Sequence, residues 1–269
     1  MKTRIISGIV MGVIVAAVLA LGYLWEPIVI TVAVSLLAAG AIYELLHNAA
    51  GIKCKWSLAF ACIFGFYVPF TQIINEDFGV CLIFVLFGAI IYGIISAIMI
   101  LKNHSEFSLG QIAALYGFPL CYGGAFFCLG GVINNDIGIY YLLLLLNFSS
   151  VCDMGAYFVG VTCGKHKLCP NISPKKTVEG AVGGIISSMV VTVILALCFS
   201  KSLVLPIILT IPLCILGMIG DLFASAIKRS VDLKDYGNLI PGHGGIMDRV
   251  DSIIMIAPLL YLLMIFGVI

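Results

Sequence analysis

Three aspartates have the type and spacing to hold a divalent cation: Asp221, Asp248 and Asp251. Asp248 and Asp251 are spaced i, i+3 at the start of a predicted helix, so both side chains can project from one face. Carboxylate oxygens suit Mg²⁺, which shares its coordination sphere between a few carboxylates, water and substrate phosphates. Asp-x-x-Asp alone is weak evidence, because acids at a helix N-terminus often only stabilise the helix dipole. Together with Asp221, the pair predicts a magnesium site.

Asp221 stands inside an apolar stretch, eight residues before Arg229, which is about 12 Å along a helix. An ionised carboxylate at that depth costs on the order of 3 kcal/mol unless it is paired or faces water. Ser225 and Lys228 follow at i+4 and i+7, on the same helix face. An ion pair that only holds helices together would also explain Asp221, but we favour a functional carboxylate.

Two polar segments offer groups that suit phosphate. Glycines on both sides of His243 would let phosphate oxygens approach main-chain N–H groups. In the other segment, Ser173 and Pro174 predict the N-cap and first residue of a helix, whose N-terminus would bind phosphate together with Lys175 and Lys176. A structural histidine and an ordinary basic loop remain the alternatives. Further cations that could neutralise phosphate charge are Lys228, Arg229 and Arg249.

The composition of the chain indicates the elements that position these residues. Of 269 residues 62% are hydrophobic and 10% are charged, against roughly 25% charged in soluble domains. A soluble fold of this size could not bury so much apolar surface, so a soluble enzyme, a disordered chain and a disulfide-rich secreted module are disfavoured. The net charge of +1 gives no indication of a nucleic-acid partner.

Stretches of about 17 to 25 apolar residues can cross a membrane as helices. We therefore expect an all-α polytopic membrane protein, a single domain over 1–269. With a cytosolic N-terminus and an external C-terminus, all 14 Lys and Arg residues except Lys201 fall on the cytosolic side. The polar segments 153–179 and 221–251 would then face the cytosol. The predicted transmembrane helices, about nine in number, are 5–24, 28–46, 57–73, 79–101, 111–133, 138–160, 179–199, 203–229 and 252–269.

The segment from Ser225 to Asp251 closely resembles the signature of the phosphatidate cytidylyltransferases, also called CDP-diacylglycerol synthases. The resemblance rests on fixed spacings between Ile227-Lys228-Arg229, Lys234-Asp235, His243-Gly244-Gly245 and Asp248-Arg249-Val250-Asp251. Two further segments, Asp153–Tyr157 and Ser173–Gly180, resemble family segments in the expected order. Val178 and Val161 depart from residues common in that family, an aromatic and a basic residue respectively.

The resemblance implies a nucleotidyltransferase of phospholipid biosynthesis, in which CTP and phosphatidate give CDP-diacylglycerol and pyrophosphate with Mg²⁺. It leaves open a second metal ion and a homodimeric assembly. It also implies a multi-pass protein of the inner or plasma membrane, with the active site facing the cytosol. By resemblance, the catalytic residues are Asp221, Asp248, Lys228, Arg229, His243 and Asp153, the substrate-binding residues are Ser173, Lys175, Lys176, Ser225, Lys234 and Arg249, and the metal ligands are Asp221, Asp248 and Asp251.

Two other functions remain as alternatives. A CTP-dependent lipid alcohol kinase would transfer the γ-phosphate instead of the cytidylyl group. An ion-coupled membrane transporter would use its buried carboxylates to relay ions. The transporter is disfavoured because the first half of the chain offers no charge-lined set of helices and the phosphate-suited loops fall on one side.

Overall fold

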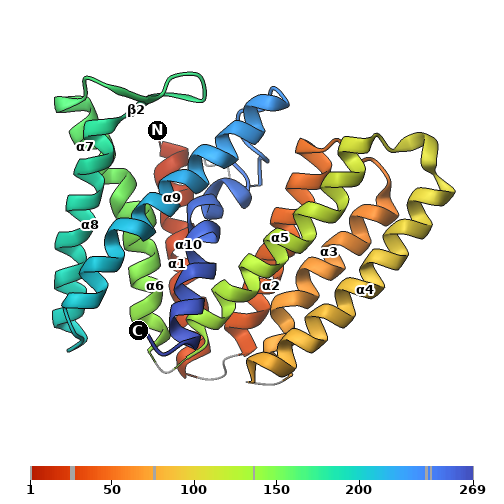
Figure 1. Ribbon diagram of the computed structural model, residues 1–269, viewed down its shortest axis with the longest axis horizontal. Helices are drawn as coiled ribbons and strands as arrows, with labels where there is room; N and C mark the ends of the chain where they lie inside the picture. The colour runs from red at the N-terminus through yellow and green to blue at the C-terminus, as the bar shows by residue number, and fades with distance from the viewer. Residues whose placement is uncertain are drawn as a thin grey trace. The chain divides into compact units, whose positions relative to one another are not determined.

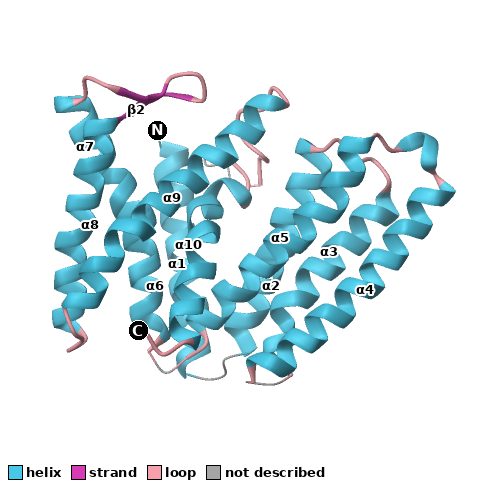
Figure 2. Ribbon diagram, viewed as in Figure 1, coloured by secondary structure: helices cyan, strands magenta, loops and turns pink. Residues whose placement is uncertain are grey.

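The structure is a computed structural model that describes residues 2–24, 28–74, 77–135, 137–239, 242 and 244–268. The chain forms two compact units, which are described separately below. Unit 1 comprises Met1–Asn134 and Val231–Arg249, and unit 2 comprises Asn135–Ser230 and Val250–Ile269. Within the described ranges, every regular element is helical except one short pair of strands (Figure 2).

Unit 1 is built from long apolar helices that lie side by side, with α3 between α2 and α4 (Figure 1). Local sequence explains where two of them begin. The Asp77 carboxylate accepts a hydrogen bond from the Val80 N–H, and Ser108 forms a capping box with Gln111. The helices are α1 (Lys2–Leu24), α2 (Ile28–Glu44) with a π-helical turn at Leu45–Ala49, α3 (Lys55–Phe70) with a 3₁₀ turn at Thr71–Ile73, α4 (Phe78–Lys102) followed by a 3₁₀ turn at His104–Glu106, and α5 (Leu109–Ile133).

Unit 2 places a two-stranded hairpin at one end of a group of helices (Figure 1). Strands β1 and β2 pair antiparallel. Helix α10 begins in unit 1 and continues in unit 2. The elements are α6 (Gly138–Leu146), a π-helical turn at Asn147–Val151, α7 (Cys152–Cys163), β1 (Lys167–Cys169), β2 (Ser173–Thr177), α8 (Val178–Cys198), α9 (Val204–Ser230) and α10 (Met247–Ile265).

The helical architecture agrees with the all-α prediction, and the observed helices match the predicted ranges within a few residues at most ends. In the described part of the chain, seven helices are long and apolar enough to cross a membrane. Helix α10 is not among them, because Asp248, Arg249 and Asp251 lie in its first turns. Among the described side chains of α1, the residues Gly12–Gly22 form an apolar stretch. A membrane protein with several spanning helices follows from these lengths and compositions.

One local prediction was wrong. Ser173 and Pro174 do not begin a helix; they lie in strand β2, and α8 begins at Val178. The N-cap is Thr177, whose hydroxyl accepts a hydrogen bond from the Gly180 N–H at 3.1 Å. Pairing with β1 keeps residues 173–177 extended, so tertiary context decides against the Ser-Pro capping signal.

Helices α7 and α8 approach each other very closely because glycines form the contact. A Cβ at Gly184 would lie 2.5 Å from the Cys152 carbonyl oxygen, and a Cβ at Gly180 would lie 2.6 Å from that of Ala156. Small residues at such positions are typical of helix contacts in membranes, where close backbone packing replaces the hydrophobic effect. The contact fixes α7 against the N-terminal turns of α8.

Buried polar side chains connect the π-helical turn before α7 to α8, and α8 to α9. The Asn147 side-chain amide donates hydrogen bonds to the Ser188 carbonyl oxygen at 3.1 Å and to the Thr192 hydroxyl at 3.0 Å. Thr192 in turn bonds to Thr210 of α9 at 3.0 Å. Interhelical hydrogen bonds of this kind stabilise helix association where no water competes.

We expect Gly184→Leu to destabilise unit 2, because the added side chain would overlap the α7 backbone. Overpacking of this kind costs about 1–3 kcal/mol, so the unfolding temperature of the purified protein in detergent should fall by several degrees. Gly117→Leu is the matched control, since a Cβ at Gly117 has no neighbour within 4 Å. Equal unfolding temperatures for the two variants would contradict the role assigned to the α7–α8 contact.

Candidate functional site

A cavity of about 260 Å³ in unit 2 gathers residues from α7, the hairpin, α8 and α9. Five residues singled out from the sequence line it, although they are spread over nearly 70 positions of the chain. Apolar neighbours complete the wall, among them Tyr157, Leu168 and Met218. The five residues are Asp153, Ser173, Lys175, Lys176 and Asp221.

The charged centre of the cavity is an ion pair between the Lys176 ammonium and the Asp221 carboxylate. Both side chains are largely buried, with 23% of Lys176 and 29% of Asp221 exposed. Asp153 lies close enough to interact electrostatically with both. The Lys176 ammonium offsets the cost of placing the Asp221 carboxylate in an apolar helix, and the cavity carries both signs of charge.

The hairpin holds the lysines over the cavity, and a second set of contacts holds the hairpin. The Val178 N–H donates to the His166 carbonyl oxygen at 2.9 Å. The Glu179 carboxylate accepts hydrogen bonds from the backbone N–H groups of Lys165 and His166, and its Oε1 lies 2.6 Å from Nδ1 of His166. Glu179 therefore ties the loop before β1 to the first turn of α8.

The remaining predicted residues of α9 lie beyond Asp221 on the same helix. Lys228 is 9% exposed, whereas Arg229 is open to solvent and Ser225 is half-buried. At Gly220, α9 comes so close to α10 that a Cβ would meet the Asp251 carbonyl oxygen at 2.8 Å. The missing side chain at position 220 therefore brings the backbone of Asp251 next to the turn of α9 that carries Asp221.

In unit 1, Asp248 organises the polar loop that precedes α10. Its Oδ2 accepts hydrogen bonds from the N–H groups of Tyr236 at 2.7 Å and Gly245 at 2.9 Å. Gly244 has a φ of 85°, a conformation that a residue with a Cβ rarely adopts. Lys234 and Arg249 are both exposed. His243, with Ile240 and Pro241, lies outside the described residues.

Two residues of the first half hold this loop and were missed by the sequence analysis. Glu44 is 5% exposed, and its carboxylate accepts hydrogen bonds from the N–H groups of Ile246 and Met247, both at 3.0 Å. The side-chain amide of Asn48 donates to the Tyr236 carbonyl oxygen at 2.6 Å. A signal was available, because an acid inside an apolar stretch as long as 28–46 demands a partner.

The acidic residues suit magnesium in their chemistry. Asp153 and Asp221 present carboxylates to one cavity, and Mg²⁺ commonly binds to one or two carboxylates with water and substrate phosphates completing the sphere. Within the described ranges, no three His, Cys, Asp or Glu side chains form a metal-binding group. Asp221, Asp248 and Asp251 as a set of ligands therefore stay a prediction.

Comparison with known proteins places the chain in a family. The model of the cytidylyltransferase family matches residues 2–266, so this chain belongs to the cytidylyltransferase family. Among its relatives, the phosphatidate cytidylyltransferase of Bacillus subtilis (strain 168) is 31% identical over 273 residues, covering 98% of this chain and 97% of the relative. That of Staphylococcus aureus (strain COL) is 30% identical over 274 residues, covering 98% and 99%.

We expect Glu44→Ala to loosen the loop before α10, since it removes both acceptors of the Ile246 and Met247 N–H groups. Leaving a buried donor without a partner costs roughly 1–3 kcal/mol, which should lower the unfolding temperature measured in detergent. Glu106→Ala removes an exposed acid of the same unit and serves as the control. If Glu44→Ala unfolds at the temperature of Glu106→Ala, the carboxylate does not stabilise the loop.

Proposed function

We propose that this protein transfers the cytidylyl group of CTP to phosphatidate, forming CDP-diacylglycerol and pyrophosphate. The observation that carries the proposal is the similarity to proteins named phosphatidate cytidylyltransferase over 98% of the chain. The cavity on Asp221 supports it, because it offers cations and carboxylates in one place. The reaction is a step of phospholipid synthesis.

The reaction needs no nucleophile from the protein. A phosphate oxygen of phosphatidate forms a bond to the α-phosphorus of CTP, and the bond from that phosphorus to the bridging oxygen breaks as pyrophosphate leaves. Catalysis then depends on holding the reactants in line and on neutralising the charge that moves to the leaving group. Lys175 and Lys176 of the hairpin supply positive charge for the phosphates, and Ser173 supplies a hydroxyl beside them.

The metal ligands that the resemblance implies are Asp221, Asp248 and Asp251, and Asp153 lines the same cavity as Asp221. A magnesium ion held there would supply further charge neutralisation at the phosphates. The ion pair bears on how Asp221 would hold the ion. Lys176 already neutralises Asp221. If that carboxylate held a magnesium ion, Lys176 would leave it and bind a phosphate oxygen of the substrate. Asp248, Asp251, Lys228, Arg229, His243, Ser225, Lys234 and Arg249 complete the proposed set by resemblance.

The proposal includes the cellular setting. The protein would lie in the inner or plasma membrane with its N-terminus and polar segments in the cytosol, where CTP is present. The distribution of Lys and Arg supports that orientation. Phosphatidate would reach the site laterally from the bilayer. The segments 153–179 and 221–251 would belong to one catalytic domain. If the protein is a homodimer, each protomer would carry one such site.

Labelled CTP tests the reaction directly. Purified protein with Mg²⁺, phosphatidate and α-³²P-CTP should produce labelled lipid, whereas γ-³²P-CTP should release label only as pyrophosphate. Label passing from the γ-position to lipid would instead identify a lipid kinase. Absence of labelled lipid from either substrate would contradict the proposal and favour a transporter.

Asp221→Asn and Asp248→Asn should each lower turnover at least about 100-fold, as loss of a group that positions or neutralises reacting phosphates does. Each substitution keeps the shape of the side chain and removes its charge. The membrane-inserted yield should stay near that of the wild type, whereas the unfolding temperature of Asp221→Asn should fall, because the Lys176 ammonium loses its ion-pair partner. Near-normal turnover of both variants at saturating Mg²⁺ would exclude both carboxylates from metal binding.

A further inference from the structure

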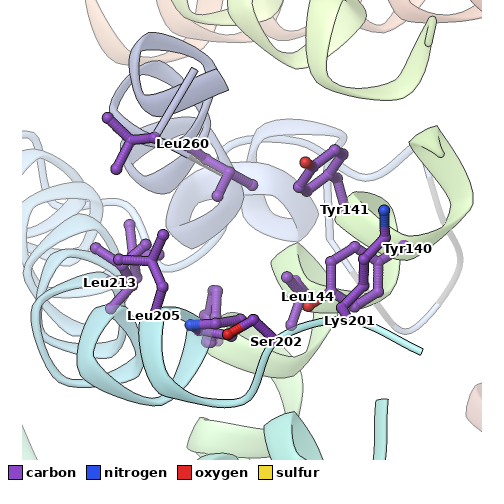
Figure 3. A pocket seen from close by; sticks show the side chains of 12 residues that line it. Tyr140, Tyr141, Leu144, Lys201, Ser202, Leu205, Leu213 and Leu260 are labelled. Atoms are coloured by element: carbon purple, nitrogen blue, oxygen red, sulfur yellow. The ribbon is translucent and has the colours of Figure 1, made fainter. Parts of the chain in front are cut away.

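Unit 2 contains a second cavity, of about 240 Å³, that the proposed reaction does not use (Figure 3). Its wall is mostly apolar and includes Leu144, Phe148, Leu213 and Leu260. The cavity lies where α8 is joined to α9, at the end of α8 opposite the hairpin. The 21 residues of α8 separate the two ends by about 30 Å, the thickness of a hydrocarbon core.

Four side chains with polar groups line this mostly apolar cavity: Lys201, Ser202, Tyr140 and Tyr141. Lys201 is exposed and forms no ion pair with any residue of the described ranges. Tyr140 is only 3% exposed, and its hydroxyl has no hydrogen-bond partner in that part of the structure. Figure 3 shows Tyr140 and Lys201 on one side of the cavity and Leu205 and Leu213 on the other.

The backbone holds Lys201 at the cavity in a defined way. The Lys201 N–H donates to the Ala196 carbonyl oxygen at 2.8 Å, and the Ser200 N–H donates to that of Leu197 at 3.2 Å. This is the Schellman arrangement that ends a helix, and its left-handed residue is normally glycine. Here Ser200 takes that position with a φ of 52°, a strained conformation for a residue with a Cβ.

A cation at the C-terminal end of α8 also stabilises the helix dipole. That role requires neither an apolar cavity beside the lysine nor a buried tyrosine hydroxyl without a partner. A ligand that has an anionic group, a hydrogen-bond acceptor and a long apolar part accounts for all three features. Free phosphate would satisfy only the lysine and serine.

We propose that this cavity binds an anionic phospholipid as an accessory ligand. Its phosphate would lie on Lys201 and Ser202, an ester carbonyl oxygen would accept a hydrogen bond from the Tyr140 hydroxyl, and one acyl chain would fill the apolar interior. The site is separate from the cavity on Asp221, so this inference does not depend on the proposed reaction. It gives a function to Lys201, the one basic residue that the sequence predicts on the external side.

Lipid retention tests the proposal without any measurement of activity. The full chain, purified in detergent, is incubated with dioleoyl phosphatidylglycerol, and bound lipid is counted by native mass spectrometry. Lys201→Ala should reduce retention about fivefold, the value of one lysine near an anionic headgroup, while Lys201→Arg should retain the lipid. Leu209→Trp keeps the lysine but fills the cavity, and it should also reduce retention.

The controls separate this site from general surface binding. Lys53→Ala removes an exposed lysine that does not line the cavity, and it should retain phosphatidylglycerol as the wild type does. Dioleoyl phosphatidylcholine, which carries no net charge, should bind less well than phosphatidylglycerol. Inorganic phosphate at millimolar concentration should not displace the bound lipid.

Four results would overturn the proposal. Wild-type retention in Lys201→Ala would exclude the headgroup contact, and equal retention of phosphatidylcholine would leave only an apolar pocket. Displacement by inorganic phosphate would indicate a site for a free anion. Conversion of a dimer to a monomer by Leu209→Trp, observed by size-exclusion chromatography with light scattering, would show that a second copy of the chain covers the cavity.

Discussion

The ion pair between Lys176 and Asp221 is the interaction on which the candidate site depends, because it reconciles a carboxylate with an apolar helix. Water is scarce around a spanning helix, so the charge of Asp221 requires a partner within the protein. The partner comes from a strand of the hairpin and not from a neighbouring helix. The carboxylate of Asp221 in α9 therefore requires the hairpin to lie beside it. The same position of the hairpin places Lys175 and Lys176 at the cavity.

Close packing of the helices in unit 2 supports the geometry of this ion pair. The glycines between α7 and α8 let the two backbones touch, and Gly220 does the same for α9 and α10. Larger side chains would force the helices apart and widen the cavity that Asp153 and Asp221 share. Hydrogen bonds also fix how these helices are oriented, because they are directional and dispersion forces are not. They join Asn147, Thr192 and Thr210.

Sequence reasoning could predict the helices and much of the cavity but not the contacts that hold them. The length of an apolar run predicts the length of a helix, because a helix must be long enough to cross the hydrocarbon core of the membrane. The charges of Asp153, Lys176 and Asp221 stood out because the chain has so few. Ser173 and Pro174 misled, since a local capping signal cannot reveal that residues 173–177 pair with another strand. The bonds of Glu44 span about 200 positions of the chain, a separation at which no local pattern exists.

The contact of Glu44 with Ile246 and Met247 also bears on how this family can diverge. The first half of the chain carries no recognisable motif, yet its second helix provides the acid that holds the start of α10. A chimera that joins the first half of one relative to the second half of another should fold well only if that carboxylate is preserved. The structural requirement of the loop before α10 therefore extends to a single acidic position in the apolar helix α2.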